Sequence, residues 1–146
     1  MRTRYKEYLR LNRNLFLAAS AAFIMAAITA QLVAKSASYL NTSVTLAAEY
    51  SVFFSIFGWL QFRGSKKRYA LESGQLDWKR FRFDLIKLVT SLGVGEIVYT
   101  VLRWLSQYYL LTQSIEPYLA SIISSITSFC VYLTVVNLTV KATRLY

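Results

Sequence analysis

The chain has 146 residues, of which 55% are hydrophobic, and it carries a formal net charge of +10. A chain of this length leaves room for a single membrane domain over residues 1–146, without a separate soluble core. Its basic residues lie beside apolar runs rather than on a folded polar domain, which argues against nucleic-acid binding. With no histidine and one cysteine, the chain lacks the usual ligands of zinc and haem and the base of a nucleophile–histidine pair. We therefore expect no enzyme activity, no metal site and no cofactor.

Four apolar runs follow one another along the chain. Each has roughly the 20 residues that a helix needs to cross the ~30 Å hydrocarbon core of a bilayer. They cover residues 15–34, 42–62, 85–111 and 118–140. The sequence predicts an all-α polytopic membrane protein, a four-transmembrane-helix bundle with two short outer turns and a basic amphipathic inner loop over 63–84.

Lysine and arginine fall mainly on alternate connections between these runs. Five of the seventeen precede the first run, eight lie between the second run and the start of the third, and two follow the fourth. Lys35 in the first outer turn and Arg103 inside the third run are the two exceptions. Because cytoplasmic loops retain Lys and Arg, we predict that both termini are cytoplasmic (N-in/C-in) and that the protein lies in the plasma membrane.

Two basic stretches flank the predicted spans. Residues 2–13 interleave positive charges with Tyr and Leu, a pattern typical of an amphipathic helix in the headgroup region or of a solvated leader that sets orientation. Aromatic and basic residues also alternate over 78–83, just before the third run. Because Trp and Arg anchor helices at membrane interfaces, we predict that this second stretch contacts lipid headgroups. Its members are Trp78, Lys79, Arg80, Phe81 and Arg82.

Small residues form stripes on two of the runs. In the first run they recur at every fourth position, at Ala18, Ala22, Ala26 and Ala30. In the fourth run the stripe contains Ser121, Ser124, Ser125 and Ser128. Small residues let helix backbones approach closely in lipid, so we predict that both stripes are helix-packing surfaces. The pattern leaves open whether they serve contacts within the bundle or between subunits.

Three charged residues lie inside the predicted spans: Glu49, Glu96 and Arg103. Each costs roughly 2.5–3.5 kcal/mol near the bilayer centre on the insertion scale, so each requires a partner or a function. Glu96 and Arg103 are two turns apart on one helix face. The same face also carries, on it or beside it, Tyr99, Thr100 and Gln107. We predict that this polar stripe points into the bundle or a wet cavity.

Depth along the helices predicts a partner for Arg103. Glu49 lies about 10 Å, and Arg103 about 12 Å, below the outer ends of their runs at 1.5 Å per residue. The two side chains are therefore level, and we predict an ion pair between them. Glu96 lies deeper and is the best single candidate for a functional residue. Its carboxyl is expected either to be neutral and hydrogen-bonded, or to bind a cationic or hydroxylated group.

Asn41-Thr42-Ser43 matches a glycosylation sequon on the predicted outer side. The acceptor lies very close to the membrane, and a motif this short is common by chance. It therefore carries little weight as a modification site.

The layout resembles the GtrA-like family of small four-helix membrane proteins, which have two helix pairs joined by a basic amphipathic connection. Three short segments carry the resemblance: Arg82-Phe83, Trp59-Leu60-Gln61-Phe62 and Pro117-Tyr118-Leu119-Ala120. The terminal Trp-x-x-Phe of that family is absent from the second half. The resemblance implies a role in moving or presenting polyprenyl-phosphate-linked sugars, with anionic lipid or polyprenyl phosphate as partner and without catalytic residues.

Three functions therefore remain open. The first is translocation or presentation of lipid-linked sugars. The second is a non-catalytic accessory subunit of a larger membrane complex; the protein partners that the sequence leaves open are other membrane subunits or further copies of the chain in a homo-oligomer. The third is a small proton-coupled exporter that uses Glu96.

Overall fold

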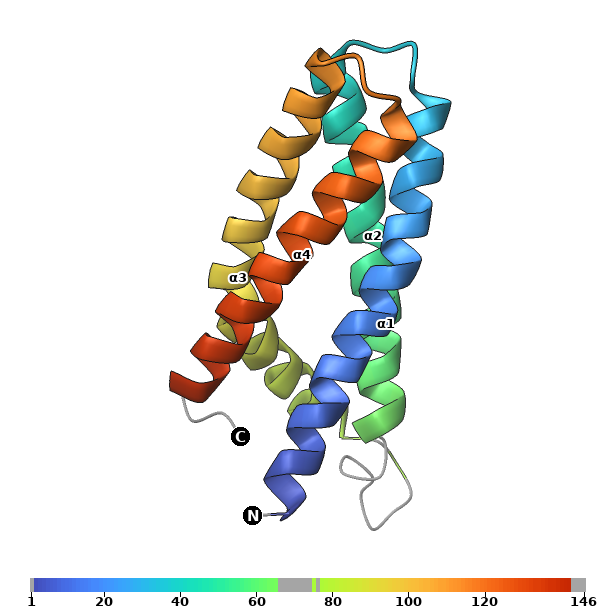
Figure 1. Ribbon diagram of the computed structural model, residues 1–146. Coiled ribbons are helices and arrows are strands. Elements are labelled where there is room, and N and C mark those ends of the chain that lie inside the picture. The colour runs from blue at the N-terminus through green and yellow to red at the C-terminus, as the bar shows by residue number, and fades with distance from the viewer. Residues whose placement is uncertain (1, 66–74, 76, 143–146) are drawn as a thin grey trace.

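The computed structural model describes residues 2–65, 75 and 77–142, and these form an all-helical bundle (Figure 1). Its helices are α1 (Arg2–Leu32), α2 (Ser38–Ser65), α3 (Trp78–Thr112) and α4 (Pro117–Ala142). Each helix predicted from the sequence is present, and each is longer than its apolar run. Consecutive helices run in opposite directions, so the start of α1 and the end of α4 lie at the same end of the bundle (Figure 1).

Three of these helices are long and apolar enough to cross a membrane: Tyr8–Leu32, Ser38–Gly64 and Pro117–Thr139. Over its described residues α3 does not form such a span, and part of its apolar run (85, 87–89 and 91) lies outside the described side chains. The structure therefore shows a helical protein with three helices long and apolar enough to cross a bilayer, and α3 is the longest of the described helices.

The basic stretch over residues 2–13, for which the sequence left open an interfacial helix or a solvated leader, is helical and is not separate from the first span. α1 begins at Arg2 and continues without interruption into the apolar run. Leu11 and Asn14 are buried inside the bundle, and the Asn14 amide donates to Gln61 Oε1 of α2 at 2.8 Å. Tyr8 donates to Asn137 Oδ1 of α4 at 2.7 Å. These contacts between helices hold the leader as the first turns of α1.

The predicted inner loop over 63–84 is too long. α2 continues to Ser65, and α3 already begins at Trp78; the remainder, apart from 75 and 77, lies outside the described residues. Asp77 is the N-cap of α3, and its carboxylate accepts a hydrogen bond from the Arg80 backbone N–H at 3.0 Å. A side-chain acceptor at this position satisfies one of the orphan donors of the first turn, which favours helix formation there.

The alanine stripe of α1 faces the interior of the bundle. Ala18, Ala22, Ala26 and Ala30 are at most 1% exposed. Ser121 and Ser125 of α4 are also fully buried. α1 packs against α2 and α4, whereas α3 packs against α4 and, more sparsely, against α2. The stripes therefore serve contacts within one chain, which settles the question that the sequence left open.

Gly95 lies at a close approach between α3 and α4. A Cβ atom at this position would lie 2.7 Å from Val136 Cγ2 and 3.1 Å from Tyr132 Cε2 of α4. At Gly93, one half-turn earlier, a Cβ atom would meet nothing within 4 Å. Only the second glycine of the pair is therefore required by packing.

Candidate functional site

The centre of the bundle is an ion pair between α2 and α3. Arg103 Nη2 lies 2.9 Å from Glu49 Oε2, and Arg103 Nε donates to the same oxygen at 3.0 Å. The arginine side chain is 0% exposed and the glutamate side chain 3%. The structure confirms the ion pair predicted from helix depth. Opposite charges in contact inside a low-dielectric bundle stabilise each other far more than they would in water.

The other N–H groups of the Arg103 guanidinium also have hydrogen-bond acceptors. Arg103 Nη1 donates to Gln107 Oε1 and, at 2.7 Å, to Ser124 Oγ of α4. Nη2 donates to Ser121 Oγ at 3.0 Å. Each nitrogen of the Arg103 guanidinium thus has a partner, and two of the partners come from the serine stripe. The stripe therefore provides hydroxyl acceptors for a buried cation as well as space for close packing.

The network continues through Asn41 toward the end of the bundle opposite the two termini. Gln107 Nε2 donates to Asn41 Oδ1 at 3.1 Å, and Asn41 Nδ2 donates to the backbone carbonyls of Ala30 at 2.8 Å and Val33 at 3.0 Å. Asn41 is 1% exposed, so its amide is not free to accept a glycan. The sequon-like motif is instead part of the core. The network therefore joins groups from α1, α2, α3 and α4.

Glu49 receives further donors on both oxygens. The Tyr99 hydroxyl donates to Oε1, and the Ser125 hydroxyl donates to Oε2 at 3.5 Å. This arrangement gives the carboxylate a cation and two hydroxyl donors while leaving only a few per cent of its side chain exposed. A charge held in this way is a structural element, because removing any partner leaves polar groups buried without compensation.

Glu96 has a different environment. Its Oε1 accepts a hydrogen bond from the Tyr132 hydroxyl of α4 at 2.8 Å. Among the residues that the structure describes, no Lys or Arg side chain forms an ion pair with it. Thr100 donates to the Glu96 backbone carbonyl at 2.7 Å, and Tyr50 of α2 hydrogen-bonds to the Thr100 hydroxyl. The predicted polar stripe is thus divided: Arg103 and Gln107 belong to the ion-pair network, whereas Thr100 belongs with Glu96.

A small cavity of about 20 Å³ is lined by residues of both networks. Glu49, Glu96 and three tyrosines line it, together with apolar side chains; the tyrosines are Tyr50, Tyr99 and Tyr132. A space of this size holds roughly one water molecule. Tyr50 and Glu96 also line an outer groove between α2 and α3 of about 370 Å³. Glu96 therefore stands between the interior of the bundle and its outer surface.

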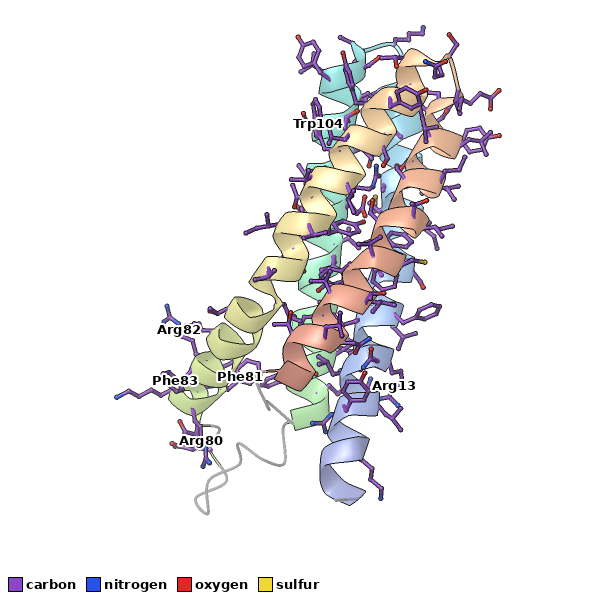
Figure 2. The ribbon with its side chains drawn as sticks, turned by 60° about the vertical axis from the view of Figure 1, so that its left-hand side comes forward. Arg13, Arg80, Phe81, Arg82, Phe83 and Trp104 are labelled. Atoms are coloured by element: carbon purple, nitrogen blue, oxygen red, sulfur yellow. The ribbon has the colours of Figure 1, made fainter. Side chains whose placement is uncertain are left out.

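The aromatic–basic segment forms the first turns of α3, at the end of the bundle that holds both termini. In Figure 2, Arg80, Arg82 and Phe83 project away from the bundle. Trp78 and Phe81 instead pack on Phe62 of α2, with ring centroids 5.4 and 5.3 Å apart. The segment is thus docked by its aromatic side and exposes its cations.

These exposed cations line an open groove. Lys79, Arg80 and Arg82 form its basic part, and Phe83 and Ile86 form its apolar part. Asp77 also lines it, although one oxygen of that carboxylate is used as the N-cap. Of the five residues predicted to contact headgroups, three line this groove, and Trp78 and Phe81 pack on α2, although Trp78 is still 60% exposed.

In comparison with known proteins, no family model, no curated protein and no solved structure matches the chain. The site must therefore be interpreted from its own geometry. Sequence reasoning missed Asn14 and Asn41, which bond across the bundle. The sequence did contain a signal for these bonds, namely an amide side chain beside an apolar run. At Asn41 we interpreted that side chain only as part of the sequon.

Proposed function

We propose that this chain is a four-span protein of the plasma membrane, with both termini cytoplasmic, whose inner end binds lipid phosphate. In this proposal it presents or moves polyprenyl-phosphate-linked sugars. The observation that carries the phosphate part is the groove at the start of α3, where Lys79, Arg80 and Arg82 adjoin apolar Phe83 and Ile86. The sugar carrier is the class that the resemblance to GtrA-like proteins implies.

The placement of α3 across the membrane is supported by the way its charges are matched. Arg103 is neutralised by Glu49, and its remaining nitrogens bond to side chains of α3 and α4. Both side chains of this ion pair lie inside the bundle, at 0% and 2% exposure, so neither charge is presented to lipid. Charged residues inside membrane bundles normally pair in this manner. We therefore include α3 as the fourth span.

The orientation is supported by the distribution of charge between the two ends. The first turns of α1 and α3 and the end of α2 carry Arg13, Arg63, Arg80 and Arg82 at one end of the bundle. The turn between α1 and α2 at the opposite end carries only Lys35. Cytoplasmic ends of membrane proteins retain positive charge, and the basic end is therefore assigned to the cytoplasm.

The inner groove has the chemistry that a lipid phosphate requires. Arginine offers planar, paired donors to phosphate oxygens, and the dipole at the N-terminus of α3 favours an anion, although Asp77 already accepts from the Arg80 backbone N–H there. Phe83 and Ile86 are 58% and 54% exposed, so the exposed part of each side chain can contact the first carbons of a lipid chain. A free phosphate would use only the basic half of such a surface, whereas a lipid phosphate uses both halves.

Native mass spectrometry of the protein in nanodiscs tests this proposal. The probes are polyprenyl phosphate, phosphatidylglycerol and phosphatidylcholine, each offered in turn. We expect retention of polyprenyl phosphate by the wild type and its loss in the R80Q/R82Q double variant. K35Q, which removes one exposed cation at the other end, is the matched control and should retain the lipid. Equal retention of phosphatidylcholine, or no effect of the double variant, contradicts the proposal.

A non-catalytic accessory subunit is the second candidate. Its supporting observation is that the interior cavity beside Glu49 has room for roughly one water molecule, while the polar groups around it bond mainly to one another. Such a centre is suited to rigidity rather than to the passage of a sugar. Co-purification with unrelated subunits in gentle detergent, without retained polyprenyl phosphate, would favour this candidate over the first.

A further inference from the structure

The groove between α2 and α3 is a second feature with the properties of a binding site. Tyr50 and Phe54 of α2 form one wall, with their rings stacked at 5.6 Å between centroids. Glu96, Thr100 and the apolar side chains Ile97 and Val101 form the other wall. Its volume of about 370 Å³ falls in the range of small-molecule sites. With the four-span placement proposed above, this groove opens to the lipid.

The groove contains one ionisable carboxyl whose charge is not matched. Glu96 is partly exposed, and in the described part of the chain its carboxyl has a hydroxyl donor, Tyr132, but no cation. A carboxylate without a cation is costly at membrane depth, so the empty groove favours a carboxyl that holds its proton. A cation that entered the groove would remove that cost and displace the proton.

The groups that face Glu96 from the neighbouring helices do not supply that cation. α2 contributes Tyr50 and Glu49, and α4 contributes Tyr132. On the side of α1 the cavity is lined by Ala19, Ala22 and Phe23, which carry no charge. Arg103 is engaged with Glu49, Gln107, Ser121 and Ser124.

We propose that the α2–α3 groove binds a lipophilic monovalent cation at Glu96 in exchange for the proton of that carboxyl. The apolar walls contact the hydrophobic body of the cation, and its charge lies against the carboxylate and the stacked rings of Tyr50 and Phe54. The face of an aromatic ring attracts a cation that lies within about 6 Å of the ring centre. The exchange balances as one cation bound and one proton released, with no covalent bond of the protein formed or broken apart from the O–H of Glu96.

Binding of tetraphenylphosphonium to the full chain in phosphatidylcholine nanodiscs tests the proposal, with empty nanodiscs as the blank. Bound radiolabel and proton release into a weakly buffered solution are measured together. We expect the wild type to bind the cation and to release about one proton for each cation bound. E96Q should lose at least about tenfold in affinity, as is typical when one partner of a desolvated charge pair is removed. It should also release no proton.

E116Q is the matched control, because Glu116 is exposed in the outer turn and the substitution makes the same change in charge. It should bind and release protons as the wild type does. Absence of binding to the wild type, equal binding by E96Q, or binding without proton release would each overturn the proposal. The R80Q/R82Q variant leaves this groove unchanged, so failure of the lipid-phosphate site and failure of the cation site are distinguishable.

A second measurement on the wild type covers the case in which E96Q does not fold. A hydrophobic carbodiimide adds to a protonated carboxyl: the acid proton goes to one nitrogen, the carboxyl oxygen bonds to the central carbon, and the rearranged acylurea retains the whole reagent. Peptide mapping should find this adduct on Glu96 and not on Glu49, which is ion-paired. Tetraphenylphosphonium at a concentration that fills nine-tenths of the sites should slow the labelling about tenfold. No adduct on Glu96, or labelling at an unchanged rate, overturns the proposal.

Discussion

Glu49 and Glu96 are two glutamates in one bundle that line the same small cavity and accept hydrogen bonds from tyrosines. They differ in what else they contact. Glu49 has Arg103 at 2.9 Å and a side chain that is 3% exposed, whereas Glu96 has no cation partner among the described residues and borders an open groove. The comparison teaches that burial alone does not define the role of a membrane carboxyl. A cation within reach makes it structural, and its absence leaves it available for a proton or a ligand.

Removing Arg103, the cation that pairs with Glu49, should have the largest effect on stability. Arg103→Ala leaves the carboxylate buried without a partner, and breaking a buried pair in this way costs about 3–5 kcal/mol. We expect that loss in the free energy of unfolding, measured by titration of the detergent-solubilised protein with a denaturing detergent. Replacing Glu49 by Ala in the same chain should recover most of it, because no uncompensated charge then remains. A double variant as unstable as Arg103→Ala would show that the pair does not hold the bundle.

Much of this comparison was predictable from the sequence. Four apolar runs and the depth of Glu49 and Arg103 were enough to predict the helices and the ion pair, because helix rise per residue is fixed. The residues at which the helices begin and end were less predictable. Charged leader residues are compatible with several environments, and only the contacts of Asn14 and Tyr8 with other helices place them in α1. The split of the polar stripe depends on which neighbour each side chain meets, and a one-helix pattern does not contain that information.

A serine that hydrogen-bonds to the ion pair should contribute more to stability than a serine that only packs in the same stripe. Ser124 Oγ accepts from Arg103 at 2.7 Å, so Ser124→Ala should cost roughly 1.5–3 kcal/mol, the range for hydrogen bonds to charged groups. Ser128 Oγ is buried without a hydrogen-bond partner in the described residues. Ser128→Ala should therefore be neutral or slightly stabilising by the same detergent titration. Equal losses at both positions would mean that the stripe acts through packing alone.

The hydrogen bond between Tyr132 and Glu96 depends on the close contact of α3 and α4 at Gly95. Gly95→Ala places a methyl group 2.7 Å from Val136 Cγ2, which should separate α3 from α4 at a cost of about 1–3 kcal/mol. It should also move the Tyr132 hydroxyl away from Glu96. Gly93→Ala is the matched control; it meets nothing within 4 Å and should stabilise the helix by roughly 0.5–1 kcal/mol. Thermal unfolding followed by circular dichroism measures both, and a loss at Gly93 as large as at Gly95 would contradict the packing argument.

The same substitution at the two glutamates compares them directly, and at Glu96 it has the smallest expected effect. If Glu96 holds its proton, as proposed above, Glu96→Gln exchanges one neutral group for another of the same shape that still accepts from Tyr132, so the loss of stability should stay below about 1 kcal/mol. Glu49→Gln removes the charge opposite Arg103 and should cost about 3–5 kcal/mol, because the arginine is then buried without its anion. Both values come from the same detergent titration, so uncertainty in the unfolded reference state largely cancels. Comparable losses would mean that Glu96 is ionised and held by a positive group, which would remove the distinction between the two carboxyls.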